Sequence, residues 1–392
     1  MTTATMTRSL VSDEMLETFG QRAPIYDREN RFFSEDFEDL RNAGYLKMPI
    51  PTEFGGLGYT MEQVALEQRR LAYRAPATAL ATNMHLYWMG IARDLYMAGD
   101  SSLEWMLREG AAGEVFAAGH AEMGNDLPGL LSTSSAERVE GGWRINGRKM
   151  FGSLGPSWTY MGIHAMDTSN PAAPQVIHVF VPRNTPGVTT IETWDTLGMR
   201  ATRSDDTMFD NVFVPDKYVG RILPAGAADH FILALFGWAL INMSNIYYGI
   251  SLRARDLAVA GAKKKTSLAV TRSMAYHPEF QHDAAEMTIE IEAMGPHIDR
   301  IAADWTNGVD HGAEWPSKLV AAKYHIVESA KRVVDLAMDM SGGAGMFKGN
   351  ELERLYRDVR CGGFHPANSH LTHEIVGKTT LGIGLEEQPR WG

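Results

Sequence analysis

The sequence has few of the residues that build covalent or metal cross-links. Its 392 residues include a single cysteine, Cys361, so an internal disulfide is excluded. No group of cysteine and histidine residues has the spacing of a zinc site, and we expect no metal. A chain of this kind suits the reducing cytoplasm, where thiols stay free.

The sequence also lacks a basic surface and long apolar runs. Acidic residues outnumber basic ones, 48 to 37, the formal net charge is −11, and no block of Lys or Arg stands out. We therefore expect no nucleic-acid partner. No stretch reaches the roughly 18 consecutive apolar residues of a membrane span, and the N-terminal MTTATMTRSLVSDEM lacks the apolar centre of a signal peptide. We expect a protein that is neither secreted nor embedded in a membrane.

The hydrophobic period divides the chain into three parts. Residues 1–114 have apolar residues at helical spacing, interrupted by PTEFGGLGYT, in which Thr60 and Gln63 can form a helix cap. Residues 115–226 alternate in segments such as WRINGRKMFGS, QVIHVFVP, GVTTIETW and DTMFDNVFVP. Residues 227–392 return to helical spacing, with helices expected near 231–262, 278–307, 316–341, 352–359 and 368–381. The sequence predicts a mainly α protein with a central β-domain.

The segment 341–368, SGGAGMFKGNELERLYRDVRCGGFHPAN, is the most informative part of the chain. Three glycines lie between two helical patterns: Gly342, Gly343 and Gly345. Glycine permits positive φ and lets the backbone approach a phosphate or a ring, although such a turn is common in proteins. Four charged residues follow at helical spacing: Glu353, Arg354, Arg357 and Asp358. They either anchor a subunit contact or pair with one another.

Four segments occur in the order and at the spacing seen in the acyl-CoA dehydrogenase superfamily: PTEFGGLGYT, WRINGRKMFGS, WDTLGMRATRSDDTMFDNVFVP and SGGAGMFKGNELERLYRD. The chain resembles this family from about Asp13 to Gly382, and residues 197–215 are the most specific part. The resemblance implies an N-terminal helical domain, a β-barrel-like middle domain and a C-terminal four-helix bundle. It also implies FAD bound where the domains meet, in a homotetramer or homodimer.

The resemblance assigns several positions to the flavin ring. Phe151, Gly152 and Ser153 stand where the family has Trp, Ile and Thr, on the segment that lies against the ring. An aromatic side chain at 151 can still stack, and a hydroxyl at 153 can still hydrogen-bond near N5. Ala121 replaces the threonine of the family's Thr-Glu pair and keeps Glu122, so one side-chain hydrogen bond is lost. Without the family, Phe151 reads equally well as a core aromatic.

The resemblance also assigns residues to the adenine side of the cofactor. The three glycines match a GGxG turn that approaches the FAD of a neighbouring subunit, while Asp339 replaces a family glutamine. An acid near a pyrophosphate is unfavourable unless it is paired. Arg272 is the candidate partner of the pyrophosphate, and Lys263–Lys265 read more simply as a solvated basic run.

The family's catalytic glutamate, which removes the α-proton of an acyl thioester, falls on Pro366. Proline supplies neither a carboxylate nor an N–H. Some relatives carry this glutamate on an earlier helix, near Ala239 here, but no acid occurs between Phe231 and Arg255. His365 is the candidate substitute base, although a histidine in a Gly/Pro loop is more often structural. Further titratable residues follow on the next helix: His370, His373 and Glu374.

Three functions therefore stay open, and the first is slightly preferred. The first is FAD-dependent oxidation of an acyl-CoA or carrier-bound acyl thioester with a non-standard base and electron transfer flavoprotein as acceptor. The second is a reduced-flavin-dependent monooxygenase supplied by a flavin reductase, which oxygenates an aromatic, amine or sulfur centre and needs no α-proton base. Ser153, Asn368 or His370 would then hydrogen-bond the flavin. The third is a non-catalytic subunit, which the retained glycines and Ser153 disfavour.

Overall fold

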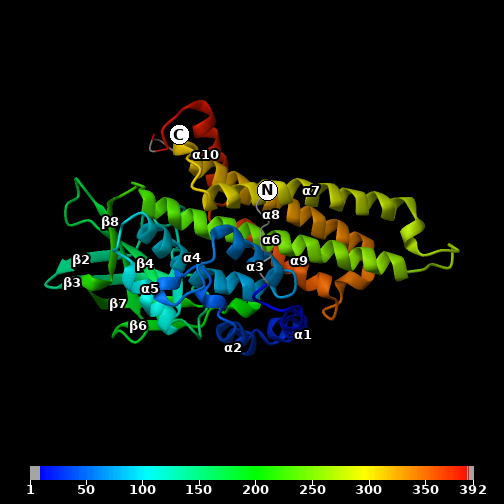
Figure 1. Ribbon diagram of the computed structural model, residues 1–392, viewed down its shortest axis with the longest axis horizontal. Helices are drawn as coiled ribbons and strands as arrows, with labels where there is room; N and C mark the ends of the chain where they lie inside the picture. The colour runs from blue at the N-terminus through cyan, green and yellow to red at the C-terminus, as the bar shows by residue number, and fades with distance from the viewer. Residues whose placement is uncertain (1–8, 386, 388–392) are drawn as a thin grey trace.

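The structure is a computed structural model that describes residues 9–385 and 387. Its first region is helical (Figure 1) and consists of α1 (Asp13–Glu29), α2 (Ser34–Asn42), α3 (Met61–Ala72), α4 (Pro76–Met97) and α5 (Glu104–Ala112). The expected cap before α3 is confirmed. The Thr60 side chain accepts a hydrogen bond from the Gln63 N–H, and the Gln63 side chain accepts one from the Thr60 N–H. Both bonds satisfy donors that the first turn of a helix leaves open.

The middle region is a mixed sheet with the strands β1 (Phe116–Gly119), β2 (Ser135–Val139), β3 (Gly142–Lys149), β4 (Tyr160–Asp167), β5 (Gln175–Pro182), β6 (Val188–Ile191), β7 (Asp206–Pro215) and β8 (Val219–Pro224). Their order is β6-β7-β3-β2-β4-β5-β8, and β1 pairs in parallel with β4. QVIHVFVP and DTMFDNVFVP form β5 and β7 as predicted. WRINGRKMFGS differs, because β3 ends at Lys149 and the chain then leaves the sheet.

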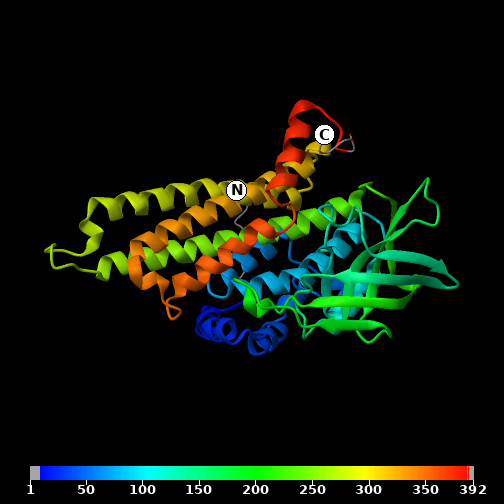
Figure 2. The ribbon, with the colours of Figure 1, turned by 180° about the vertical axis from the view of Figure 1, so that it is seen from behind.

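The last region is a helical bundle with α6 (His230–Lys264), α7 (Pro278–Thr306), α8 (Trp315–Ser341), α9 (Glu351–Cys361) and α10 (Ser369–Leu381). These bounds lie within two residues of the predicted helices. Helices α6, α7, α8 and α9 run side by side, and α10 projects away from the bundle (Figures 1 and 2). The predicted fold class, mainly α with a central β-domain, is confirmed.

Helix α6 is apolar enough and long enough to cross a membrane by composition alone. However, 83% of its most apolar window is buried inside the protein. Its side chains pack against α3, α4 and α8, and Trp238, Ile241 and Tyr247 are almost completely buried. Such burial is typical of the core helix of a globular fold.

Helix α4 joins the sheet to the bundle. The Trp88 indole N–H donates to the Ala117 carbonyl of β1 at 3.0 Å. A Cβ at Gly162 of β4 would lie 2.3 Å from the Trp88 ring, and a Cβ at Gly90 would lie 2.1 Å from Trp238 of α6. Glycine at both positions therefore allows α4 to pack closely between the two layers.

Candidate functional site

Two strained backbone segments pack together where the chain leaves β3. Phe151 and Leu154 in the first segment have φ of 57° and 67°, and Met199 and Arg203 in the second have 54° and 43°. A residue with a side chain pays about 1–3 kcal/mol for such a conformation, and these conformations cluster at functional sites. The Leu154 N–H donates to the Thr202 carbonyl at 3.2 Å, which joins the two segments. The geometry marks this junction as a candidate site.

Phe151 presents an open aromatic face at the junction. Its side chain is 51% exposed, and its ring meets Trp194 edge to face with centroids 5.8 Å apart. The N–H groups of Thr193 and Trp194 both donate to Oδ1 of Asp205 at 2.9 Å, which fixes Trp194. An exposed ring on a fixed support can stack against a planar cofactor. This arrangement fits a flavin ring.

Ser153 lies at the inner side of the same junction. Its side chain is almost buried, and its Oγ lies 2.7 Å from Oγ of Ser204. The Ser204 Oγ lies 2.7 Å from Oγ1 of Thr202, which donates to the Met199 carbonyl at 2.8 Å. A chain of three hydroxyl groups therefore connects Ser153 to the backbone of the second strained segment.

Ala121 pairs with Met150, the residue before Phe151, because the Met150 N–H donates to the Ala121 carbonyl at 2.9 Å. Glu122 and Lys149, the chain neighbours of Ala121 and Met150, form a buried ion pair. Glu122 also accepts the Ser134 N–H at 3.0 Å. Burial opposes the charge of Glu122, but Lys149 and the hydrogen bonds lower its pKa to about 2. Burial lowers the pKa of Lys149 to about 8, although Glu122 opposes this shift.

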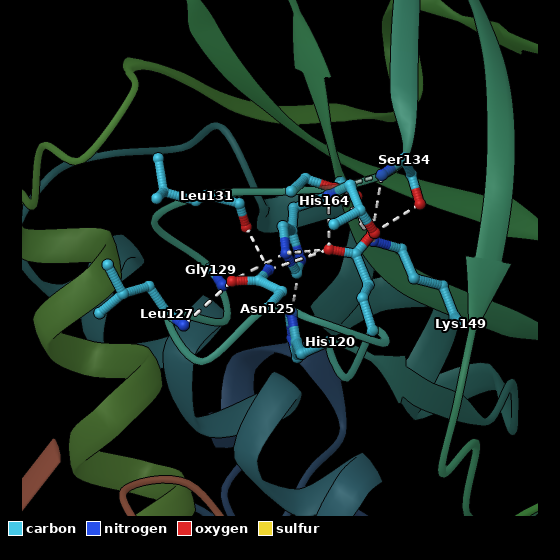
Figure 3. A network of polar contacts seen from close by, with 11 residues as sticks. His120, Asn125, Leu127, Gly129, Leu131, Ser134, Lys149 and His164 are labelled. Carbon is cyan, nitrogen blue, oxygen red and sulfur yellow. Dashed lines mark hydrogen bonds and ion pairs between the residues drawn. The ribbon is translucent and has the colours of Figure 1, made fainter. Parts of the chain in front are cut away.

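Three buried histidines, His120, His164 and His178, adjoin the ion pair. The Nδ1 atoms of His120 and His164 lie 3.2 Å apart, and the His164 and His178 rings are 5.9 Å apart across β4 and β5 (Figure 3 shows the first pair). Burial lowers the pKa of His120 to about 3 and of His178 to about 4, and it holds the pKa of His164 well below its usual value. All three rings are therefore neutral near pH 7, as the nearby ammonium of Lys149 requires. No local sequence pattern predicts this cluster, because the pairing of β4 with β5 places His164 opposite His178.

His365 is held by the bundle. Its Nε2 lies 2.7 Å from Oη of Tyr247 on α6. Burial of the imidazole, with a smaller effect of the nearby Lys323 charge, lowers the pKa of His365 to about 3. A base of this strength is poorly matched to proton abstraction near pH 7. The geometry therefore favours a structural role for His365.

Lys323 of α8 fixes the loop that contains His365 and Pro366. Its Nζ donates to the carbonyls of His365 and Ala367 at 3.0 and 2.9 Å, and the side chain is buried. Burial lowers the pKa of Lys323 to about 7. A pattern in the sequence indicates this burial, because Lys323 falls in the apolar stripe of its helix, beside Leu319 and Ile326.

The remaining candidates around this loop have other contacts. Asn368 caps α10, since its Oδ1 accepts the Leu371 N–H at 3.0 Å. His370 lies exposed in the first turn of α10. His373 Nδ1 lies 2.6 Å from the Ser369 carbonyl, and Glu374 pairs with Lys378 at 3.0 Å. The loop itself, residues 365–368, contains no carboxylate side chain.

The glycine turn lies elsewhere in the chain, after α8 at the end of the bundle away from the sheet (Figure 2). Gly342 has a φ of 64°, and Lys265 Nζ donates to the Ser341 carbonyl at 3.3 Å. Arg272 is exposed and lies over the Tyr276 ring at 4.8 Å. Within one chain, the residues near Phe151 and the glycine turn form two separate groups.

The four charged residues of α9 pair within the chain. Arg357 forms two hydrogen bonds with the Asp27 carboxylate of α1, at 2.9 and 2.6 Å, and bonds Glu353. Asp358 accepts the Met199 N–H at 2.6 Å. Of the two alternatives left by the sequence, these contacts support internal pairing, and they fix the strained segment that contains Met199.

Comparisons with known proteins agree with this architecture. Family models match three consecutive parts of the chain: "Acyl-CoA dehydrogenase, N-terminal domain" at residues 2–100, "middle domain" at 116–212 and "C-terminal domain" at 232–377. The putative acyl-CoA dehydrogenase YdbM of Bacillus subtilis is 30% identical over 89% of this chain and 90% of its own length. L-evernosamine nitrososynthase of a Micromonospora species is 30% identical over 88% of this chain and 82% of its own.

A solved structure resembles the whole chain. KijD3, in complex with FMN and dTDP-3-amino-2,3,6-trideoxy-4-keto-3-methyl-D-glucose, has a TM-score of 0.84 and 25% identity. The similarity covers 97% of this chain and 96% of KijD3. The chain therefore belongs to the acyl-CoA dehydrogenase family and is a flavin-dependent oxidoreductase.

Proposed function

We propose that this protein is a reduced-flavin-dependent monooxygenase. The observation that carries the proposal is the loop before α10. By the resemblance to the family, Pro366 takes the position of the carboxylate that thioester oxidation needs, and His365 bonds Tyr247 and has its pKa lowered to about 3. Oxygenation of a substrate by reduced flavin and molecular oxygen requires no base at an α-carbon. This reaction therefore needs no carboxylate at position 366.

The substrate class that we propose is a primary amine carried by a sugar. The support comes from relatives: L-evernosamine nitrososynthase is 30% identical, and KijD3 was solved with an amino-sugar nucleotide. The methanesulfinate monooxygenase MsuC and the complex of TdsC with FMN and indole have similar folds, but they are 17–18% identical and support the fold alone. Oxidation of an acyl thioester is the second candidate, because the putative acyl-CoA dehydrogenase YdbM is also 30% identical.

Residues of this chain would hold the flavin at the strained junction. Phe151 would stack on the ring, Ser153 would hydrogen-bond near N5, and Ala121 and Gly152 would contribute backbone surface. When bound and reduced, the flavin supplies the electrons that activate oxygen. The segment 342–345 would contact the flavin of a neighbouring subunit, together with Arg272, in a homodimer or homotetramer. We place the reaction in the cytoplasm, with a separate flavin reductase as the partner.

Two reactions with the purified protein test the proposal. The first supplies flavin, a flavin reductase with NADH, oxygen and a dTDP-linked amino sugar, with catalase present to remove free peroxide. We expect an oxygenated product, detected by mass spectrometry, that is absent when the protein or oxygen is omitted. The second mixes the flavin-loaded protein with acyl-CoAs of several chain lengths without oxygen. Bleaching of the flavin by an acyl-CoA would reject the monooxygenase in favour of thioester oxidation.

Other outcomes separate the finer points of the proposal. Oxygenation of a sulfide or an indole, but of no amine, would retain the monooxygenase and reject the amine as substrate. Protein that binds neither FMN nor FAD would reject catalysis and support a non-catalytic subunit. Phe151→Ala serves as the site control in both reactions, because its exposed side chain contributes little to the folded core.

A further inference from the structure

We propose that Ser153, Ser204 and Thr202 form a polarised hydroxyl chain that turns Ser153 into a hydrogen-bond acceptor and so favours binding of the reduced flavin. The proposal rests on the flavin position given above, with Ser153 near N5. It does not depend on which substrate is oxygenated. Ser204 and Thr202 are positioning residues, since they act through Ser153.

The chain is isolated from solvent. Thr202 is fully buried, Ser204 is 2% exposed and Ser153 is 7% exposed. Both hydroxyl contacts are 2.7 Å, the ordinary length of an O–H···O hydrogen bond. A hydroxyl group that is buried in this way donates its hydrogen bond to an acceptor within the protein. The direction of each bond therefore follows from the number of protons available.

The carbonyl of Met199 sets that direction. Each hydroxyl has one proton, and a carbonyl oxygen can only accept. The Thr202 hydroxyl donates its hydrogen bond to the Met199 carbonyl at 2.8 Å. In the contact between Thr202 and Ser204, the Ser204 hydroxyl is therefore the donor. In the contact between Ser204 and Ser153, the Ser153 hydroxyl is in turn the donor. Ser153 is left with free lone pairs and no free proton.

This polarity distinguishes the two redox states of a flavin. N5 of the oxidised ring is an acceptor, whereas N5 of the two-electron-reduced ring carries a hydrogen and donates. Ser153 as an acceptor therefore matches the reduced ring. To donate to the oxidised ring, the chain must reverse and give up the bond from Thr202 to the Met199 carbonyl. That carbonyl still accepts the Thr202 N–H at 3.1 Å, so the reversal costs one neutral hydrogen bond.

The acceptor at the end of the chain is held in place from outside. Met199 has a φ of 54°, and its N–H donates to the buried carboxylate of Asp358 on α9 at 2.6 Å. A Cβ at Gly198 would lie 2.4 Å from the Arg357 carbonyl, so the segment is packed directly on α9. The bundle thereby fixes the carbonyl toward which the hydroxyl protons point.

The test compares dissociation constants for the oxidised and the reduced form of the same flavin, measured anaerobically by fluorescence with whichever of FMN and FAD binds more tightly. Removing one neutral hydrogen bond changes an equilibrium by about three- to tenfold. We therefore expect Thr202→Val and Ser204→Ala each to lower the ratio of oxidised to reduced dissociation constants by about three- to tenfold. Tenfold corresponds to about 30 mV in the midpoint potential of a two-electron couple. Thr202→Ser should restore the ratio.

Thr82→Val is the matched control, because the buried Thr82 hydroxyl also donates to a backbone carbonyl but lies within α4. It should leave the ratio unchanged. An unchanged ratio in both Thr202→Val and Ser204→Ala, with oxidised flavin still bound, would overturn the hydroxyl chain without touching the monooxygenase. A ratio that rises would overturn the direction of the chain. Wild-type protein that binds no flavin would overturn both proposals.

Discussion

The phenol oxygen of Tyr247 lies 2.7 Å from Nε2 of His365, and this contact joins α6 to the loop before α10. Through this contact the His365 imidazole helps to hold the loop in place. Because its pKa is lowered to about 3, His365 is a weak proton acceptor near pH 7. We expect His365→Gln, which can still bond Tyr247, to retain oxygenation within about threefold between pH 6 and 9. Initial rates with a reductase-supplied flavin measure this.

Tyr247→Phe provides the stability control for that experiment. It removes the hydroxyl and leaves the ring, so it should cost about 1 kcal/mol of unfolding free energy in a denaturant titration. A loss of oxygenation above about a hundredfold in folded, flavin-bound His365→Gln would restore His365 as a proton-transfer residue.

Lys323→Met should change how stability depends on pH. The pKa of Lys323 is lowered to about 7, whereas a lysine in an unfolded chain titrates near 10.4. Between these values the unfolded state binds more protons, so this residue makes the folded state more stable as pH rises. From pH 7 to 10, wild type should gain more than about 1 kcal/mol relative to Lys323→Met. Parallel stability curves, from urea titrations at several pH values, would show that folding does not lower the pKa of Lys323.

Breaking the pair of Glu122 and Lys149 should be strongly destabilising. Either Glu122→Gln or Lys149→Met leaves one buried group without its partner, at a cost of about 3–5 kcal/mol. The double variant should cost clearly less than the sum, because no charge is then left unpaired. Denaturation of wild type, the two single variants and the double variant completes this double-mutant cycle. Additive losses would mean that the two side chains do not depend on each other.

Replacing Phe151 should separate strain from cofactor binding. Phe151→Ala and Phe151→Gly both remove the ring, so both should weaken flavin binding by about two- to tenfold. Only glycine relieves the positive φ, and Phe151→Gly should therefore be more stable than Phe151→Ala by about 1 kcal/mol. Thermal unfolding without flavin and a flavin titration measure the two effects. If both variants bind flavin as tightly as wild type, the flavin ring does not stack on Phe151.

Local patterns were enough for much of the fold. The helical period located α6 to α10 within two residues, and the alternation located β5 and β7. The Thr60 and Gln63 cap was readable because both residues act within one turn of helix. The end of β3 at Lys149 was not readable, since MFGS continues the composition of a strand. There the contacts with residues 202–205 replace the ladder and bend the chain.

The sequence by itself determined the family, the order of helices and strands, and the absence of a carboxylate at residue 366, because these depend on residue type and local spacing. Only the tertiary structure decided what the site residues do. The partner of His365 lies 118 residues away on α6, and that of Ser153 lies 51 residues away. Proton affinity and hydrogen-bond direction depend on burial and on such distant partners, which the fold alone brings into contact.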